Sequence, residues 1–274
     1  MRVGAANLQD NSRKVLELML KTELNDGIFT ITIDRPERRN ALSVSMSNGL
    51  GDLWDEVDRN DDIKVVVLTS TDCGTFCAGM DLKEAAEIKE QKGIDVLTQI
   101  RDPHHTRMLH VKKPMIAAMT GHFAAGGMML SLNCDLRVGL AGTRGGITEC
   151  KIGRGSPWAM PLLWKLPEAI LKELTLCADM MAVERFHALG FVNYVEPTPD
   201  EVRARALSLA GKIRDNAPLS VFAAKASINA TMSLGLIAGL DEAKRIHQVV
   251  YASEDAQEGP RAFREGRKPQ WKGR

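Results

Sequence analysis

Two glycine-centred segments constrain the fold of this chain more than any other feature of its sequence. Segment 76–84 has the sequence FCAGMDLKE, and segment 121–129 has the sequence GHFAAGGMM. Each has the pattern of a strand that ends in a glycine-containing turn and opens a helix. The N–H groups just after such a turn have no partner within the helix, so they can bind an anion. Two such turns brought together would hold one oxygen from two sides, which is the layout of an oxyanion hole.

Alternating strand and helix patterns surround these segments and predict an α/β fold. Runs 65–68 and 115–119 are wholly apolar, as expected of strands that are covered on both faces. Strands are also predicted at 15–23 and 27–34, joined at Asn25, Asp26 and Gly27 by a hairpin turn. Ser43 is expected to cap the helix that follows.

The pattern changes after about residue 157, beyond which the chain is almost all helical in pattern. Helices are expected at 200–214, 218–232 and 240–253. The predicted organisation is a loose N-terminal arm at 1–13, a core for binding and catalysis at 14–200, and a C-terminal helical region at 201–274.

Composition and charge exclude several function classes. The net charge of +1 and the absence of a basic stripe argue against nucleic acid as a partner. The five cysteines include no CxxC pair, so neither a disulfide framework nor a metal site is expected. The most apolar stretch, 114–134, is cut by glycines and is not expected to cross a membrane. No signal for secretion or for peroxisomes is visible, so the expected location is cytoplasmic.

The order and spacing of four segments, 31–43, 76–84, 114–135 and 147–153, resemble the crotonase, or enoyl-CoA hydratase/isomerase, superfamily. The resemblance extends from about residue 15 to the C-terminus. It implies a spiral of ββα units with a C-terminal helical region that forms homotrimers, often paired as hexamers. It also implies an acyl-CoA thioester as substrate and no cofactor beyond the CoA moiety of that substrate.

The resemblance also implies which residues bind the substrate. The two N–H donors to the thioester oxygen would be Met80, after the glycine of the first turn, and Gly126 in the second turn. Losing one such donor typically costs ~3–4 kcal/mol of transition-state stabilisation. The remaining positions that match the CoA-binding segments of the family are Arg35, Ala41, Ala78, Asp81, Leu82 and Lys83.

The acid and base positions depart from the pattern of the family's hydratases, which use two Glu residues. Met129 occupies the first position, three residues after Gly126, and cannot transfer a proton. Glu149 occupies the second, and is expected to be the catalytic base. A Glu in a largely apolar pocket has a raised pKa, which suits a base near neutral pH.

Two further side chains follow from the same resemblance. Met129 and Trp158 are expected to shape the acyl pocket, with Arg154 and Ser156 near them.

No catalytic role is predicted for the histidines. His122 is expected to be a loop residue satisfied by the backbone. His104 and His105 are expected on an exposed helix.

One retained carboxylate favours a reaction in which a single base moves one proton between two carbons. Isomerisation of a 3-enoyl-CoA to a 2-enoyl-CoA is such a reaction, and it is slightly favoured here. The alternatives are an enoyl-CoA hydratase that uses one Glu, another reaction of the superfamily (decarboxylase, lyase or hydrolase), and a degenerate member that binds CoA esters without catalysis.

Overall fold

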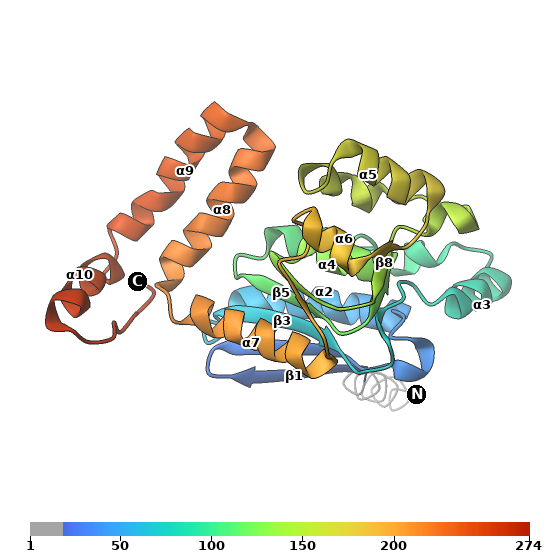
Figure 1. Cartoon of the computed structure of the whole chain (residues 1–274), viewed down its shortest axis with the longest axis horizontal. Coiled ribbons are helices and arrows are strands. Elements are labelled where there is room, and N and C mark those ends of the chain that lie inside the picture. Colours follow the sequence, from blue (N-terminus) through green and yellow to red (C-terminus); the bar gives the residue numbers. More distant parts are fainter. Residues whose placement is uncertain (1–18) are drawn as a thin grey trace, which may run out of the picture.

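The structure, a computed structural model, describes residues 19–274. The predicted arm at 1–13 and the first residues of the strand predicted at 15–23 lie outside this range. The described chain forms two β-sheets covered by helices, and a helical hairpin that leaves the body of the molecule (Figure 1). The fold is therefore α/β, as predicted. No helix in residues 19–274 is both long enough and apolar enough to span a bilayer.

The larger sheet has six strands in the order β1-β2-β3-β5-β7-β10. Among the described strands of this sheet, only β1 and β2 pair antiparallel. Their predicted hairpin turn is present, with a positive φ at Asp26 (46°) and at Gly27 (77°). Positive φ at both central residues is what a type I′ turn requires. The strands are β1 (Leu20–Asn25), β2 (Ile28–Ile33), β3 (Val65–Ser70), β5 (Met115–Met119), β7 (Leu136–Leu140) and β10 (Tyr194–Glu196).

The smaller sheet has four strands in the order β4-β6-β8-β9. Its strands alternate along the chain with those of the larger sheet, so that β3 is followed by β4, β5 by β6 and β7 by β8. In the first two of these pairs a helix follows the second strand. This is the spiral of ββα units that the sequence implied. The strands are β4 (Thr75–Cys77), β6 (His122–Ala124), β8 (Arg144–Gly146) and β9 (Met181–Ala182).

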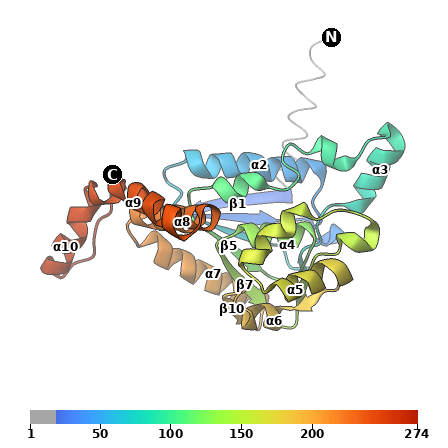
Figure 2. The same cartoon turned by 90° about the horizontal axis from the view of Figure 1, so that it is seen from above.

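Apolar side chains cover both faces of the larger sheet, as the runs at 65–68 and 115–119 predicted. Val66 and Leu68 face a core shared with α2 (Val44–Arg59), whereas Val65 and Val67 face a second core shared with α7 (Pro199–Arg214). Figure 2 shows α2 and α7 on opposite sides of the sheet. The other helices are α3 (Leu82–Lys92), α4 (Gly126–Asn133), α5 (Glu168–Lys172), α6 (Val183–Ala188), α8 (Pro218–Leu234), α9 (Leu236–Tyr251) and α10 (Asp255–Glu265).

A side-chain cap begins α2, and short helical turns connect the other elements. The Ser43 hydroxyl accepts a hydrogen bond from the N–H of Met46 (3.2 Å) and so caps α2, as predicted. The turns are the 3₁₀-helices η1 (Pro36–Arg38), η2 (Val96–Gln99), η3 (Thr106–His110), η4 (Glu149–Ile152) and η5 (Pro157–Trp164), and the π-helical turn η6 (Glu173–Cys177).

The C-terminal part contains the three predicted helices, and it also contains α10, for which no helix was predicted. Strand β10 was not predicted, and it extends the larger sheet by pairing with β7. Helix α9 begins at Leu236, four residues before its predicted start. Helix α7 lies against the sheet, while α8 and α9 pack on each other as the projecting hairpin (Figure 1).

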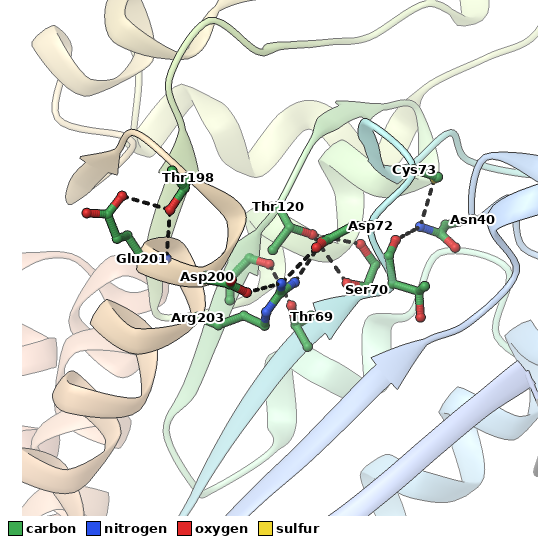
Figure 3. Close-up of polar contacts among 12 residues, drawn as sticks. Asn40, Thr69, Ser70, Asp72, Cys73, Thr120, Thr198, Asp200, Glu201 and Arg203 are labelled. Carbon is green, nitrogen blue, oxygen red and sulfur yellow. Dashed lines mark hydrogen bonds and ion pairs between the residues drawn. The ribbon is translucent and has the colours of Figure 1, made fainter.

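Hydrogen bonds and an ion pair hold the loop at 71–74, after β3, from two sides (Figure 3). Arg203 of α7 makes a bidentate ion pair with Asp72, with N–O distances of 2.7 and 2.8 Å. On the other side, the buried Asn40 amide donates to the carbonyl oxygens of Thr71 (2.9 Å) and Thr75 (2.8 Å). The loop that leads into the first glycine turn is therefore held to its neighbours before the turn begins.

Candidate active site

The two glycine turns meet in the structure. A Cβ atom at Gly79 would lie 2.8 Å from Cβ of Ala125 and 2.9 Å from the nitrogen of Gly126. A Cβ atom at Gly126 would lie 3.0 Å from Cα of Gly79. Gly79 also has a φ of 92°, which other residues rarely adopt. Only glycine at these two positions lets the turns come this close.

The N–H groups of Met80 and Gly126 have no hydrogen-bond acceptor within the described part of the chain. Leu42 pairs with Met80 as a parallel bridge: its N–H donates to the carbonyl of Gly79 (2.7 Å), and its carbonyl accepts from the N–H of Asp81 (2.9 Å). Neighbouring N–H groups of an extended strand point in opposite directions. The N–H of Met80 therefore points away from Leu42. Gly126 is the first residue of α4, where an N–H has no intrahelical partner. Both groups are thus free to donate.

Both residues line a cavity of about 120 Å³. Met129 of α4 also lines it, one turn after Gly126, and brings a thioether to the cavity wall. The lining is mostly apolar. It comprises Leu42, Ser47, Ala78, Met80, Leu82, Leu97, Ile100, Pro103, His104, His105, Ala125, Gly126, Met129, Thr148, Glu149, Ile152, Arg154, Gly155 and Trp158.

Glu149, at the start of η4, carries the one carboxylate among these lining residues. Its side chain is buried, and burial raises its pKa, although hydrogen bonds from the backbone and from Trp158 oppose the shift. The indole Nε1–H of Trp158 donates to Oε1 (3.1 Å), while Oε2 has no partner in residues 19–274. Trp158 therefore orients the carboxylate. The sequence analysis expected Trp158 to shape the acyl pocket and did not predict this hydrogen bond.

The residues predicted to bind CoA gather around the first turn. Asp81 caps α3 by accepting from the N–H groups of Lys83 (3.0 Å) and Glu84 (3.2 Å). Arg35 contacts Asp81 through an Nη1–Oδ2 distance of 2.8 Å and donates to the carbonyl of Ala41 (3.1 Å). Burial opposes ionisation of Asp81, but these hydrogen bonds and Arg35 hold its pKa below the usual value. Arg35, Ala41 and Asp81 thus form one polar cluster beneath the turn.

The other predicted CoA-binding positions differ in exposure. Ala78 and Leu82 line the cavity, and Leu82 is 53% exposed. Lys83 is exposed on the first turn of α3. Ala78 and Leu82 therefore belong to the cavity wall, whereas Lys83 is not among the residues that line it.

An ion pair joins the two loops beside the cavity. Arg154, just after η4, forms a bidentate pair with Asp95, just before η2, with N–O distances of 2.5 and 2.9 Å. The Arg154 guanidinium is the main reason why the pKa of Asp95 falls to about 2. Sequence patterns gave no indication of this contact, because the two residues are 59 positions apart.

The sequence prediction for His105 is wrong. Its side chain is 2% exposed and lines the cavity, and burial lowers its pKa to about 4. The expected exposed helix is absent because Asp102 and Pro103 start a turn, in which the Asp102 carboxylate accepts from Thr106 Oγ1 (2.6 Å) and the N–H of Arg107 (2.8 Å). An Asp-Pro pair is a turn signal that could have shown this. His104 is half-buried and also lines the cavity, whereas His122 is exposed and accepts from the N–H of Arg144 (2.9 Å).

This chain resembles known proteins in both sequence and fold. The family model described as enoyl-CoA hydratase/isomerase matches residues 23–274. The chain is 32% identical to (E)-benzylidenesuccinyl-CoA hydratase of Thauera aromatica, over 92% of this chain and 98% of the relative. It is 31% identical to carnitinyl-CoA dehydratase of Proteus mirabilis, over 90% and 96%. Among solved structures, an enoyl-CoA hydratase of Mycobacterium tuberculosis H37Rv superposes with a TM-score of 0.82 at 36% identity, covering 94% of this chain and 100% of that one.

Proposed function

Because this chain belongs to the enoyl-CoA hydratase/isomerase family and is an enzyme acting on an acyl-CoA, we propose that it moves a proton within an enoyl thioester by means of one base, Glu149. The observation that carries the proposal is that Glu149, the one carboxylate among the described residues that line the cavity, has an Oε2 atom without a partner in residues 19–274. The proposed reaction needs no cofactor beyond the CoA moiety of the substrate.

The proposed chemistry begins with the thioester oxygen held by the N–H groups of Met80 and Gly126. Glu149 removes a proton from C2 of a 3-enoyl-CoA, and the electron pair of the broken C–H bond moves toward the thioester oxygen to give a dienolate. The two N–H donors stabilise the negative charge that develops on this oxygen. Glu149 then returns the proton to C4, which leaves a 2-enoyl-CoA. Arg35, Ala41, Ala78, Asp81, Leu82 and Lys83 are proposed to contact or support the CoA moiety.

Replacement of Glu149 by Gln tests this role. The amide keeps the shape of the side chain but cannot accept a proton at neutral pH, so turnover should be lost while a CoA thioester still binds. Turnover at the wild-type rate would overturn the assignment. Tight binding of a saturated acyl-CoA by the inactive variant would separate the loss of the base from loss of the fold.

Hydration of a 2-enoyl-CoA is the second candidate reaction. It is favoured by the names of the relatives, which are a hydratase and a dehydratase. Supplying 2-enoyl-CoA and 3-enoyl-CoA separately distinguishes the two reactions. A hydratase consumes the 2-enoyl absorbance and forms a 3-hydroxyacyl-CoA, whereas an isomerase produces that absorbance from the 3-enoyl substrate.

A homotrimer or hexamer is also proposed, with the projecting helices at the contact. Leu236 is 74% exposed, Ile237 is 72% exposed and Phe263 is 90% exposed. Apolar surface of this kind is typical of an interface. Light scattering coupled to gel filtration would give the mass of the assembly, and a monomer at micromolar concentration would contradict the proposal. A cytoplasmic location stays a prediction.

A further inference from the structure

His105 is a buried polar residue for which the proposed proton transfer has no use. The residue lines the same cavity as Glu149, yet Nδ1 of its ring is buried without a partner in the described chain. Nε2 is not among the buried unpartnered atoms, and it makes no hydrogen bond with a described residue. A buried polar group without a partner costs about 1–3 kcal/mol, so such groups in native proteins call for an explanation.

The position of the ring is set by its backbone. His105 has a φ of 46°, a left-handed conformation that is uncommon for histidine and is often found at functional sites. Its N–H donates to the carbonyl of Asp102 (3.1 Å), and its carbonyl accepts from the N–H of Met108 (3.0 Å) and from Nδ2 of Asn133 (3.4 Å). Asn133 is the last residue of α4, the helix that begins with Gly126. The same helix therefore connects His105 to the second glycine turn.

The protonation of the ring follows from its surroundings. Burial favours the neutral imidazole, in agreement with the lowered pKa, and a neutral ring carries one N–H. A buried N–H without an acceptor is rarer than a buried acceptor without a donor. The tautomer with the proton on Nε2 is therefore favoured, since it leaves only a lone pair on Nδ1. In this state Nε2–H is a hydrogen-bond donor, without an acceptor among the described residues, on a residue that lines the cavity.

The charge of the cavity indicates which acceptor this donor suits. A carboxylate on the acyl group would need a cation, and Arg154 is the only Lys or Arg side chain among the described residues of the lining. Its guanidinium is already held in the bidentate pair with Asp95. Glu149 in the same cavity would also repel a second carboxylate. An uncharged oxygen avoids both costs.

We propose that His105 determines acyl specificity by donating a hydrogen bond to an uncharged oxygen, a hydroxyl, ether or keto group, on the acyl chain of the substrate. The inference rests on the proposed function, since it places an acyl-CoA in this cavity. It adds the chemical class of the acyl group: an oxygenated chain rather than a plain hydrocarbon chain or a dicarboxylic acid.

Binding to a protein that cannot turn over tests the proposal. In the Glu149→Gln background, dissociation constants would be measured by calorimetry for butanoyl-CoA, 3-hydroxybutanoyl-CoA, 4-hydroxybutanoyl-CoA, 3-oxobutanoyl-CoA and succinyl-CoA. The same panel would be measured after adding His105→Phe, which removes the donor, or His105→Gln, whose amide can donate from a position close to Nε2. His110→Phe, at the exposed end of η3, is the matched control, and thermal unfolding would check that each variant is folded.

The expected result is a preference of about tenfold or more for at least one hydroxy or keto ester over butanoyl-CoA. His105→Phe should abolish this preference without weakening butanoyl-CoA, His105→Gln should restore part of it, and His110→Phe should leave it unchanged. A preference that survives in His105→Phe, or a panel in which succinyl-CoA or butanoyl-CoA binds best, would overturn the inference. Failure of every ester to bind would instead contradict the proposed function.

Discussion

Trp158 and Glu149 form the one side-chain hydrogen bond that the described structure gives to the proposed base, with 3.1 Å between Nε1 and Oε1. The bond occupies one carboxylate oxygen and leaves the other without a partner. A donor to the ionised form lowers the pKa of a carboxylic acid, whereas burial raises it. Trp158 thus acts as a positioning residue that also limits how far burial can suppress ionisation of Glu149.

Replacing Trp158 with Phe should slow turnover and shift its pH dependence. Without the indole donor the pKa of Glu149 rises further, so a higher pH is needed to ionise the base. The acidic limb of the kcat profile should move to higher pH, and kcat at pH 6 should fall roughly tenfold, as expected for a lost hydrogen bond to a charged group. Trp164→Phe, at a 69% exposed position, is the control. An unchanged acidic limb in Trp158→Phe would contradict the coupling of these two residues.

Glu149 should also make the stability of the fold depend on pH. Because its folded pKa is raised above the ordinary value of 4.5, the folded state binds the proton more tightly than the unfolded state. Its contribution to stability is therefore greatest in acid and is lost as pH rises through the folded pKa. The difference in Tm between Glu149→Gln and the wild type should therefore grow in favour of the variant as the pH rises from 4 to 7. It should grow by ~2–4 °C for each kcal/mol of stability that the wild type loses. Calorimetry beside the exposed Glu87→Gln would check this, and a gain that shrinks with rising pH would contradict it.

Substitution of Gly79 by Ala should damage both stability and activity. The new Cβ would contact Cβ of Ala125 at 2.8 Å and the nitrogen of Gly126 at 2.9 Å, so the two turns would have to separate. Displacing one N–H donor should lower kcat by ~10²–10³-fold. Gly142→Ala is the matched control, because that glycine also has a positive φ (74°) but nothing within 4 Å of the added atom. Gly142→Ala should lower the free energy of unfolding by only ~1–2 kcal/mol, because alanine is strained in a left-handed conformation. It should leave kcat unchanged. Equal losses of kcat in the two variants would show that the contact between the turns is unimportant.

Ala125 offers a stabilising change at the second turn. Its φ of 49° and ψ of −115° lie in a region that favours glycine. Such a conformation costs another residue on the order of 1–3 kcal/mol. Ala125→Gly should therefore raise the free energy of unfolding by about 1 kcal/mol, after allowing for the greater entropy of glycine in the unfolded chain. Ala86→Gly, at an exposed position within α3, should lower it by about as much. Urea unfolding would compare them, and a loss of stability in Ala125→Gly would refute the assignment of strain.

Local patterns predicted the α/β class, because glycine, apolar periodicity and capping residues act over a few positions, whereas the pairing of the two turns around one oxygen was implied by the family resemblance. The hairpin at Asp26 and Gly27 and the strands covered on both faces are examples of such local patterns. Strand β10 was missed because three residues do not establish a periodicity, and its pairing partner β7 lies more than 50 positions earlier. The burial of His105 was missed because the segment was expected to be an exposed helix, whereas it folds as a turn that begins at Asp102.

Helix α4 connects the two ends of the proposed substrate site. Its first residue is Gly126, and its last, Asn133, holds the backbone of His105. At about 1.5 Å of rise for each of its eight residues, the helix is about 12 Å long. Adding or removing one residue within it would turn everything beyond that point by about 100°, since an α-helix has about 3.6 residues per turn. Under the proposed role of His105, exchanging residues at 102–106 would alter acyl selection alone, whereas a change in the length of α4 would disrupt thioester binding and acyl selection together.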